Sequence, residues 1–503
     1  MNRLRLILLG ICFVNGAYAQ YIFTRQNTDN YWFKGVYEDS VSKNLYITAS
    51  LIKSTPGYLN TTSNIFKLDK NGVLLDSIKI DSNLMVNAAI TKIGNNHYIH
   101  GSQAVNTNTS AFKAIPVIYK CDQNFNIIKK LVLDSNFVSD DALVNAHLLQ
   151  KNNRLYIAFA LMNYSTVRLF KLDFNLNKLD SLTFNGSFTC DLANYGNRIL
   201  LSGAGFPSMS LTGKNQVAEL DTSFNVLSRF NLDSVTSVNP GCFQKVGVTY
   251  GHTNLYELSS NRYLMTGYSK VTYNSSCQWY IKNTNAIIKN NSIIEKSNII
   301  GKPGAHILYT MPYTSSHKKY NYIFTTGMYG YNYSNPYPPQ SAPTEIMVNK
   351  IDTAANLIWV NYYSTPNYYY SPLGVTGTSD SGCVVTGMRY NLLAPAVANT
   401  CEGFVLKLDK NGVIQYTGIN DKDIIQKPIV NIYPNPASKE ITLEVNSNDY
   451  FELEIYNSIG ELVKYETRVK EKTTINTEGL PQGLYHFKLQ SNKNNYSGKF
   501  IKQ

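Results

Sequence analysis

The alternation of hydrophobic and polar residues along the chain predicts many short β-strands. One pattern recurs: an apolar residue, Lys, a second apolar residue and Asp, followed by a turn and another apolar strand, as in Phe170-Lys171-Leu172-Asp173. A degenerate copy, Ile281-Lys282-Asn283, is included. Self-similarity of this kind indicates a repeat architecture. The final positions of the copies are Asp69, Asp122, Asp173, Asp221, Asn283, Asp352 and Asp409.

Each repeat unit also contains an earlier strand, such as Arg154-Leu155-Tyr156-Ile157-Ala158. About four short strands fit into each unit, and seven units of four strands are typical of a β-propeller. We therefore predict an all-β chain in which residues 20–418 form a seven-bladed β-propeller. The segment from Tyr21 to Trp32 precedes the first full unit and is expected to complete the last blade. The alternative is an open, elongated array of sandwiches.

The repeated Asp invites comparison with calcium-binding loops. Such loops need oxygen ligands at alternating positions and a distal bidentate Glu, whereas Asp69-Lys70-Asn71-Gly72 has a Lys inside and lacks that Glu. Asn-Gly supplies the positive φ of a tight hairpin, and Asp side chains bond nearby backbone N–H groups. We therefore expect these Asp residues to fix hairpins, and we predict no metal site.

A different pattern begins after a polar linker at residues 419–428. The stretch Phe451-Glu452-Leu453-Glu454-Ile455-Tyr456 alternates, with Glu expected outward and the apolar residues inward. Asn457-Ser458-Ile459-Gly460-Glu461 forms a turn, and Leu480-Pro481-Gln482-Gly483 leads into another strand. Residues 429–503 are therefore predicted to form a small antiparallel β-sandwich.

Four ordered blocks stand out at the end of the chain: Tyr433-Pro434-Asn435-Pro436, Tyr456-Asn457-Ser458-Ile459-Gly460, Leu480-Pro481-Gln482-Gly483-Leu484-Tyr485 and Lys499-Phe500-Ile501-Lys502. Together they resemble the type A carboxy-terminal sorting domain of the type IX secretion system of Bacteroidetes. The resemblance implies type IX machinery as a partner and delivery of a cargo to the cell surface or the medium. The residues that carry the sorting signal are then Pro434, Asn435, Pro436, Gly460, Gly483, Tyr485, Lys499 and Lys502.

The amino terminus predicts an export leader. Arg3 and Arg5 precede an apolar run from Leu6 to Val14, and Ala17-Tyr18-Ala19 fits a cleavage site. Residues 1–19 are therefore expected to be a signal peptide, with transit through the periplasm. No later run reaches the roughly 18 apolar residues of a membrane-spanning helix, so we predict no transmembrane segment in the mature chain.

Export makes disulfides plausible among the six cysteines that follow the leader. The most local pairs are Cys383 with Cys401 and Cys242 with Cys277, although the sequence leaves the connectivity open. No two cysteines are spaced as C-x-x-C, which disfavours a zinc or redox centre.

Composition changes the picture mainly through its 38 Tyr residues and its net charge of +12. Several tyrosines gather in the longest repeat units, where inserted loops often bind ligands, and a Tyr ring suits stacking on sugars or protein contacts. The basic residues are dispersed rather than arranged in the stripe that nucleic acid requires, so no nucleic-acid partner is predicted. The candidate ligand-binding residues are Tyr329, Tyr331, Tyr333 and Tyr337.

The sequence carries no recognisable catalytic or cofactor motif: G-x-S-x-G, H-E-x-x-H, the P-loop and a placed G-x-G-x-x-G are all absent. We therefore predict no catalytic residue and no cofactor. The leading interpretation is an exported binding or adhesion protein for a surface glycan or protein. The alternative is a carbohydrate-active hydrolase or lyase whose acids converge from separate blades.

Overall fold

In the computed structural model every assigned element is a strand, among the residues that it describes. The chain divides into two compact units, Met1–Ile425 and Gln426–Gln503, which are described separately. The described residues are 22–25, 30–55, 58–82, 84–86, 90–105, 113–135, 145–161, 166–185, 191–202, 216–231, 234–239, 244–259, 262–272, 279–289, 293–300, 316–330, 343–393, 401–414, 425–427, 430–445, 450–470, 472–491 and 495–503. The expected signal peptide lies outside them.

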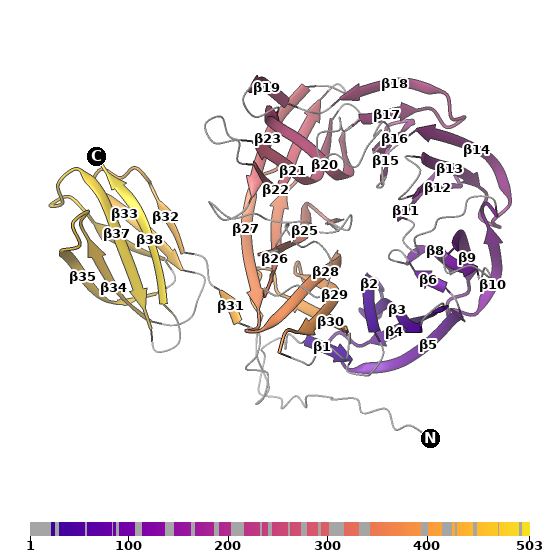
Figure 1. The fold of residues 1–503 in the computed structure, drawn as a ribbon, viewed down its shortest axis with the longest axis horizontal. Helices are drawn as coiled ribbons and strands as arrows, with labels where there is room; N and C mark the ends of the chain where they lie inside the picture. The colour runs from indigo at the N-terminus through magenta and orange to yellow at the C-terminus, as the bar shows by residue number, and fades with distance from the viewer. Residues whose placement is uncertain are drawn as a thin grey trace. The chain divides into compact units, whose positions relative to one another are not determined.

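The larger unit contains seven sheets in its described part (Figure 1), numbered here by their order along the chain. Sheet 1 consists of β2 (Asn30–Glu38), β3 (Leu45–Thr55), β4 (Tyr58–Leu68) and β5 (Leu74–Ser82). Sheet 2 consists of β6 (Leu84–Val86), β7 (Thr91–Ile93), β8 (Asn96–Val105), β9 (Lys113–Cys121) and β10 (Ile127–Val132). Sheet 3 consists of β11 (Asn145–Lys151), β12 (Arg154–Leu161), β13 (Thr166–Leu172) and β14 (Lys178–Asn185).

The remaining four sheets repeat this antiparallel order. Sheet 4 consists of β15 (Asp191–Tyr195), β16 (Arg198–Ser202), β17 (Gln216–Leu220) and β18 (Val226–Asn231). Sheet 5 consists of β19 (Ser234–Asn239), β20 (Gln244–Ser259), β21 (Arg262–Thr272), β22 (Trp279–Lys289) and β23 (Ile293–Ile300). Sheet 6 consists of β24 (Ser316–Lys319), β25 (Tyr322–Tyr329), β26 (Glu345–Asp352) and β27 (Leu357–Ser364). The short strand β31 (Ile425–Lys427) lies at the boundary between the two units. Sheet 7 consists of β28 (Tyr368–Gly377), β29 (Cys383–Asn391), β30 (Glu402–Leu408) and β1 (Ile22–Arg25).

Hydrophobic cores lie between successive sheets rather than inside one central layer. Ile118 of sheet 2, for example, packs in one core with Ile157 and Phe170 of sheet 3. The series returns to its start, because Val384 and Val405 of sheet 7 share a core with Phe33 of sheet 1. Each sheet therefore buries both faces against its neighbours, and the arrangement is propeller-like (Figure 1) rather than an open array.

The expected closing strand is confirmed for β1, which pairs antiparallel with β30 from Ile22 opposite Leu406 to Arg25 opposite Gly403. The prediction is wrong for the rest of the segment, since Asn30 to Trp32 begin β2 of sheet 1. The strand β1, from the beginning of the unit, thus covers the edge of sheet 7, which is formed by the end of the unit. Without β1, the edge strand β30 would expose unpaired backbone groups.

The role predicted for the repeated Asp as a hairpin residue is confirmed. In sheet 3, Oδ1 of Asp173 accepts hydrogen bonds from the backbone N–H groups of Asn175 and Asn177, each at 2.8 Å. These bonds lower the pKa of Asp173 because they stabilise its carboxylate. The same pair of bonds, to the residues two and four positions later, recurs at Asp69, Asp122, Asp221, Asp352 and Asp409.

In two copies the Lys of the repeat reaches the turn of the next sheet. Nζ of Lys171 in sheet 3 donates to the carbonyl of Thr222 in the sheet 4 turn, at 2.7 Å, and Nζ of Lys350 in sheet 6 donates to the carbonyl of Lys410 in the sheet 7 turn, at 3.2 Å. In these two copies the Lys therefore adds a bond between neighbouring sheets, whereas Lys407 in sheet 7 donates to Asp380 and to the carbonyl of Leu408 within its own sheet.

The register of sheet 5 corrects one copy of the repeat. The pair Tyr263 and Ile288 in sheet 5 corresponds to the pair Leu155 and Leu172 in sheet 3. The third strand has a β-bulge just before this pair in both sheets, after Ile287 in sheet 5 and after Lys171 in sheet 3. Lys289 thus occupies the position of Asp173. The copy assigned to residues 281–283 is wrong because that stretch lies well before the end of β22, and a single Lys after an apolar residue does not fix a register.

The smaller unit has two sheets around one core. Phe451, Leu453 and Ile455 point into this core and Glu452 points outward, as the alternation predicted. One sheet consists of β32 (Val430–Tyr433), β33 (Glu440–Val445) and β36 (Lys472–Asn476). The other consists of β35 (Leu462–Val469), β34 (Phe451–Tyr456), β37 (Gly483–Gln490) and β38 (Asn495–Lys502).

Candidate functional site

The sequence blocks at the two ends of the smaller unit meet in space. The backbone N–H of Ile501 donates to Oδ1 of Asn435 at 2.9 Å, and Ala437 forms a parallel bridge with Lys502. The N–H of Ala437 donates to the carbonyl of Ile501 at 2.8 Å, and the N–H of Gln503 donates to the carbonyl of Ala437 at 2.7 Å. Residues 435–437 therefore form a clasp around the terminal strand β38, and Pro434 and Pro436 belong to the same loop.

Tyr485 and Lys502 support this clasp from within the unit. The Tyr485 ring is buried and stacks on Phe500 with centroids 5.4 Å apart, and its hydroxyl donates to the carbonyl of Pro481 at 2.7 Å. Lys502 is also buried, and its Nζ donates to the carbonyl of Gln503 at 2.6 Å. Lys499 on the same strand is exposed.

The two predicted glycines lie in a turn and at the start of a strand. Gly460 has φ 87° in the turn between β34 and β35, where Oδ1 of Asn457 accepts from the N–H of Glu461 at 2.9 Å. A side chain would be strained at that φ, which explains why the turn uses Gly. Gly483 begins β37. The sequence identified these positions, but it gave no sign that Ala437 and Ile501 complete the clasp.

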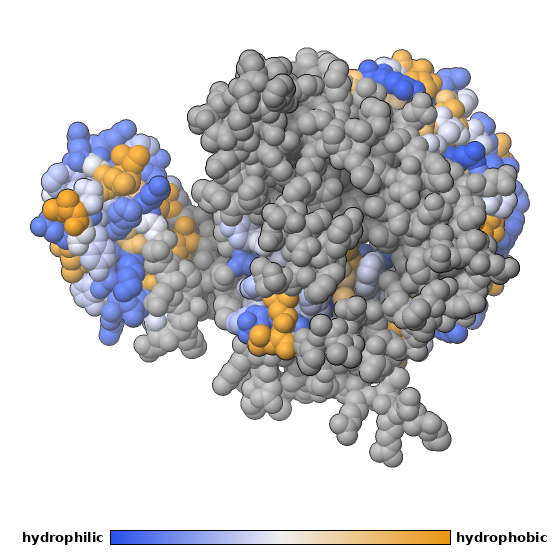
Figure 2. All heavy atoms as spheres, viewed as in Figure 1, coloured by the Kyte–Doolittle hydropathy of each residue, from blue (hydrophilic) through white to orange (hydrophobic). Residues whose placement is uncertain are grey.

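The outer face of the four-stranded sheet mixes apolar and charged groups. Leu484 and Ile501 pair across β37 and β38 and are 39% and 47% exposed, beside the pairing of His486 with Lys499. Figure 2 shows hydrophobic residues scattered among hydrophilic ones on the visible surface of this unit. The side chains that the sorting blocks leave available to a partner are therefore partly apolar and partly basic.

In the larger unit, the described tyrosines mostly serve the cores between sheets. Tyr329 is half-buried at the end of β25 and packs edge to face on Tyr362, with centroids 5.3 Å apart. Tyr98 is buried and donates to the carbonyl of Phe174 in the next sheet's turn at 2.8 Å. The other three predicted ligand-binding positions, Tyr331, Tyr333 and Tyr337, lie outside the described residues.

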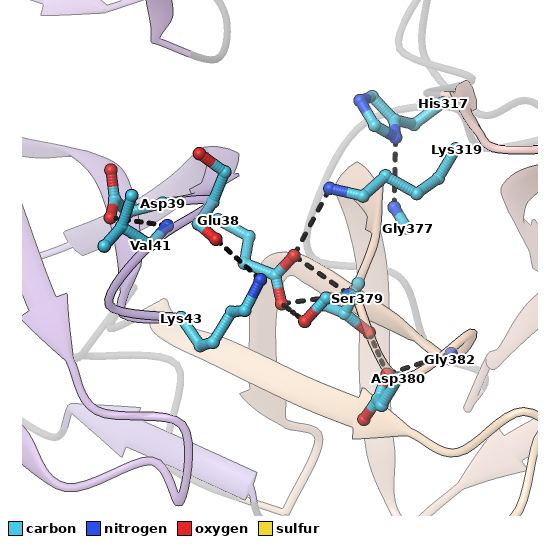
Figure 3. A network of polar contacts seen from close by, with 12 residues as sticks. Glu38, Asp39, Val41, Lys43, His317, Lys319, Gly377, Ser379, Asp380 and Gly382 are labelled. Carbon is cyan, nitrogen blue, oxygen red and sulfur yellow. Dashed lines mark hydrogen bonds and ion pairs between the residues drawn. The ribbon is translucent and has the colours of Figure 1, made fainter.

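A polar network joins sheets 1, 6 and 7 (Figure 3). The buried Glu38 carboxylate accepts from the N–H of Ser379 at 2.9 Å, from the Ser379 hydroxyl at 3.0 Å and from Nζ of Lys319 at 3.3 Å. Burial would raise the pKa of Asp380 in the same turn, but the nearby Lys407 ammonium outweighs it and lowers that pKa. The sequence did not reveal this network because its members come from distant parts of the chain.

A second polar centre joins sheets 3, 4 and 5. Nδ1 of His147 lies 2.6 Å from Oδ1 of the buried Asp191. Oδ2 of Asp191 accepts from the N–H of Leu255 at 2.8 Å. Burial opposes the charged imidazolium, yet the Asp191 carboxylate prevails and raises the pKa of His147. Nδ1 of His147 also lies 3.1 Å from the backbone N–H of Leu192, and the His147 side chain stays 39% exposed.

His97 and His100 point to opposite faces of β8, as predicted. His97 lies beside Tyr37 of sheet 1, whereas His100 lies beside Phe159 of sheet 3. Within the described part of the chain, no three or more His, Cys, Asp or Glu side chains are grouped to hold a metal ion.

The expected disulfide between Cys383 and Cys401 is wrong for this structure, which describes both residues. Cys383 is a fully buried free cysteine. It lies on β29 in the core between sheets 6 and 7, so its side chain is used for packing. Burial raises the pKa of its thiol to about 12, which keeps it protonated. Cys242 and Cys277 lie outside the described residues.

Comparison with known proteins identifies the smaller unit. Residues 431–503 match the family described as secretion system C-terminal sorting domain. No curated protein shows a significant sequence match to the chain. The family implies a type IX secreted protein, and the larger unit is its propeller-like cargo.

Solved structures similar to the chain are β-propeller domains. The β-propeller domain of the Trilobed protease from Pyrococcus furiosus has 9% sequence identity and a TM-score of 0.41, with 76% of this chain and 98% of that chain covered. The AfRom2 CNH domain has 10% identity and a TM-score of 0.39, with 78% of this chain and 98% of that chain covered. In the described ranges no helix is long and apolar enough to cross a membrane.

Proposed function

We propose that the protein is an exported binding protein: a seven-bladed β-propeller cargo over residues 20–418, carried to the cell surface or the medium by a β-sandwich sorting domain. The sorting-domain match over residues 431–503 carries the export part. The clasp supports it, because it gives the sequence blocks of the signal one common structure. In this proposal residues 1–19 direct the first step across the inner membrane, and the type IX machinery binds the folded carboxy-terminal unit.

The clasp provides a sharp test of export in the full chain. Asn435→Ala removes the acceptor for the Ile501 N–H, which lies 2.9 Å away. We expect it to loosen β38 and to shift the cargo from the cell surface and medium to the periplasm. Glu440→Ala changes an exposed residue of the same unit and serves as the control. Normal delivery of both Asn435→Ala and a chain lacking residues 480–503 would contradict a sorting role.

The direction of the strand connections supports a ligand-binding face. The antiparallel order places the Asp turns and the β24–β25 turn at one end of the sheets. Connections 301–315 and 330–344 leave sheets 5 and 6 from the opposite end, because β23 ends and β25 ends there. The second of these connections contains the predicted tyrosines. We infer that this end binds a surface glycan by aromatic stacking, with a protein ligand as the other candidate.

Two tyrosine variants test this face. Tyr331→Ala with Tyr333→Ala and Tyr337→Ala should reduce binding to a glycan panel at least tenfold if the rings stack on sugars. Tyr329 is left unchanged because its ring packs on Tyr362. Tyr320→Ala is the matched control, since Tyr320 is 62% exposed at the other end of the same sheet. Equal binding by both variants would refute the role of this face, and product analysis on the same panel separates binding from hydrolysis.

A further inference from the structure

Sheets 5 and 6 meet in a seam that is apolar in one part and polar in another. The apolar part contains Leu264 and Ile287 of sheet 5 with Ile323 and Ile351 of sheet 6. The polar part is formed by four side chains, each at most 2% exposed, and is called here the Asn/Thr cluster. Its members are Asn283, Asn285, Thr325 and Asn349.

The register of the sheets shows that two members of the cluster depart from the repeat. Thr325 on the second strand of sheet 6 lies opposite Asn349 on the third. The same pair of positions in the other six sheets holds two apolar residues, for instance Ile157 opposite Phe170 in sheet 3. The remaining pairs are Ile47 with Phe66, Ile99 with Tyr119, Leu201 with Ala218, Met265 with Ala286 and Val385 with Leu406.

Asn285 departs from the repeat on the facing side of the same seam. It lies opposite Thr266 in sheet 5, at the position that Leu169 holds opposite Ala158 in sheet 3. All of the other sheets have an apolar residue there as well. At the positions compared, the polar replacements are therefore Asn285, Thr325 and Asn349, and all three face the seam between sheets 5 and 6. A further polar replacement, His97 at the position of Leu155, faces sheet 1 instead. The apolar equivalents of Asn285 are Ile65, Ile118, Leu169, Val217, Val348 and Val405.

The cluster is only partly satisfied by the protein. Nδ2 of Asn349 donates to Oδ1 of Asn283 across the seam at a long 3.5 Å. Among the described residues, five buried atoms of the cluster have no hydrogen-bond partner in the chain. A buried donor or acceptor without a partner destabilises the folded state. These atoms are Nδ2 of Asn283, Nδ2 and Oδ1 of Asn285, Oγ1 of Thr325 and Oδ1 of Asn349.

We propose that the Asn/Thr cluster is an internal binding site for ordered water between sheets 5 and 6. The site offers amide donors, amide acceptors and one hydroxyl that can do either, and its members carry no charge. A cation would be repelled by the Nδ2 groups, and an anion would lack a compensating positive charge in the cluster. Water matches the set, because one molecule both donates and accepts and buried waters typically make about three such bonds.

The test uses the full chain and measures long-lived internal water by magnetic relaxation dispersion. Asn285→Val, Thr325→Val and Asn349→Leu together restore residues that other sheets use. We expect this triple variant to lose the signal of at least one long-lived water relative to the unaltered chain. Ile157→Val with Leu169→Val, in the apolar seams on either side of sheet 3, is the matched control and should retain the full signal. A triple variant with an unchanged signal would overturn the proposal.

A high-resolution crystal structure of the unaltered chain provides a second measurement that does not depend on the variant folding. Water oxygens within hydrogen-bond distance of Asn285 and Thr325 would support the site. Two results would overturn it: direct hydrogen bonds that satisfy all four side chains, or density for an ion or an organic solute in place of water.

Discussion

At the scale of single residues, the third position after each repeated Asp shows how packing overrides conformational preference. Two copies place Gly there, at Gly72 with φ 85° and Gly412 with φ 74°. Others place a buried apolar residue in the same left-handed region, such as Leu176 with φ 58° and Phe224 with φ 66°. The backbone strain of these residues is offset by the apolar side chain that each inserts between two sheets.

Leu176→Gly tests this balance. The change relieves about 1–2 kcal/mol of left-handed strain, but it removes a side chain that is 1% exposed, and such losses cost about 2–5 kcal/mol. We therefore expect a net loss of up to about 4 kcal/mol in the free energy of unfolding, measured by urea denaturation. Gly72→Ala is the comparison, because it adds strain without removing a buried group. A more stable Leu176→Gly variant would show that strain dominates.

His100 makes the larger unit sensitive to acid. It is 2% exposed, and burial, with the neighbouring His147, lowers its pKa to about 3. Below pH 6.5 the unfolded chain takes up a proton at this position and the folded chain does not, so stability falls as the pH drops toward 3. One such proton is worth about 1.4 kcal/mol per pH unit.

Between pH 6.5 and pH 5, the free energy of unfolding should therefore fall by roughly 2 kcal/mol less in His100→Gln than in the unaltered chain. The measurement is urea denaturation at both pH values. His147 acts in the opposite sense, because its raised pKa stabilises the fold in acid, and it is unchanged in this comparison. His486→Gln alters an exposed histidine of the smaller unit and is the control. Equal acid sensitivity with and without His100 would contradict the argument.

At the scale of elements, β1 shows how a short strand can matter beyond its length. It contributes four paired residues to the edge of β30, and it ties the beginning of the larger unit to the sheet formed last. Sheet 7 is therefore completed only when two distant segments meet, and local sequence alone does not stabilise it.

Deletion of residues 20–25 should expose the β30 edge. Each backbone hydrogen bond lost costs about 1 kcal/mol, so we expect a loss of roughly 2–4 kcal/mol in the free energy of unfolding. Hydrogen exchange should accelerate at Glu402–Leu408 and remain slow at Thr166–Leu172, which lies in the distant sheet 3. Unchanged protection of β30 would mean that β1 does not close the sheet in solution.

At the scale of the whole molecule, the shared cores make the larger unit a ring of mutually dependent sheets. A sheet of four strands buries one face against each neighbour, so the removal of one sheet would expose two cores. The bonds from Lys171 and Lys350 to the turns of the next sheets fix the order of neighbours.

Electron microscopy of the full chain tests this assembly directly. We expect two-dimensional class averages of the larger unit to show a ring with seven radial densities, the number of sheets in its described part. An elongated row of densities would contradict a seven-bladed propeller. A ring with another number would correct the blade count and leave the sorting domain unaffected.

Much of the fold was predictable because its signals are local. The spacing of Phe170, Lys171, Leu172 and Asp173 predicted a strand and a hairpin, and both are present. The alternation over Phe451–Tyr456 predicted which side chains are buried. The clasp of the smaller unit was less predictable. The sorting blocks were recognised as sequence, but the contact of Asn435 with Ile501 depends on chain topology.

The sequence by itself determined the repeat, the class of strand-rich fold and the sorting signal, because short-range periodicity and turn chemistry need no knowledge of distant neighbours. Only the tertiary structure decided which seam each side chain faces. Asn285 and Asn349 are separated by about one repeat unit in the sequence, yet they face one seam between sheets 5 and 6. Burial in this seam removes these amide groups from bulk water, so each buried polar atom needs a hydrogen-bond partner there.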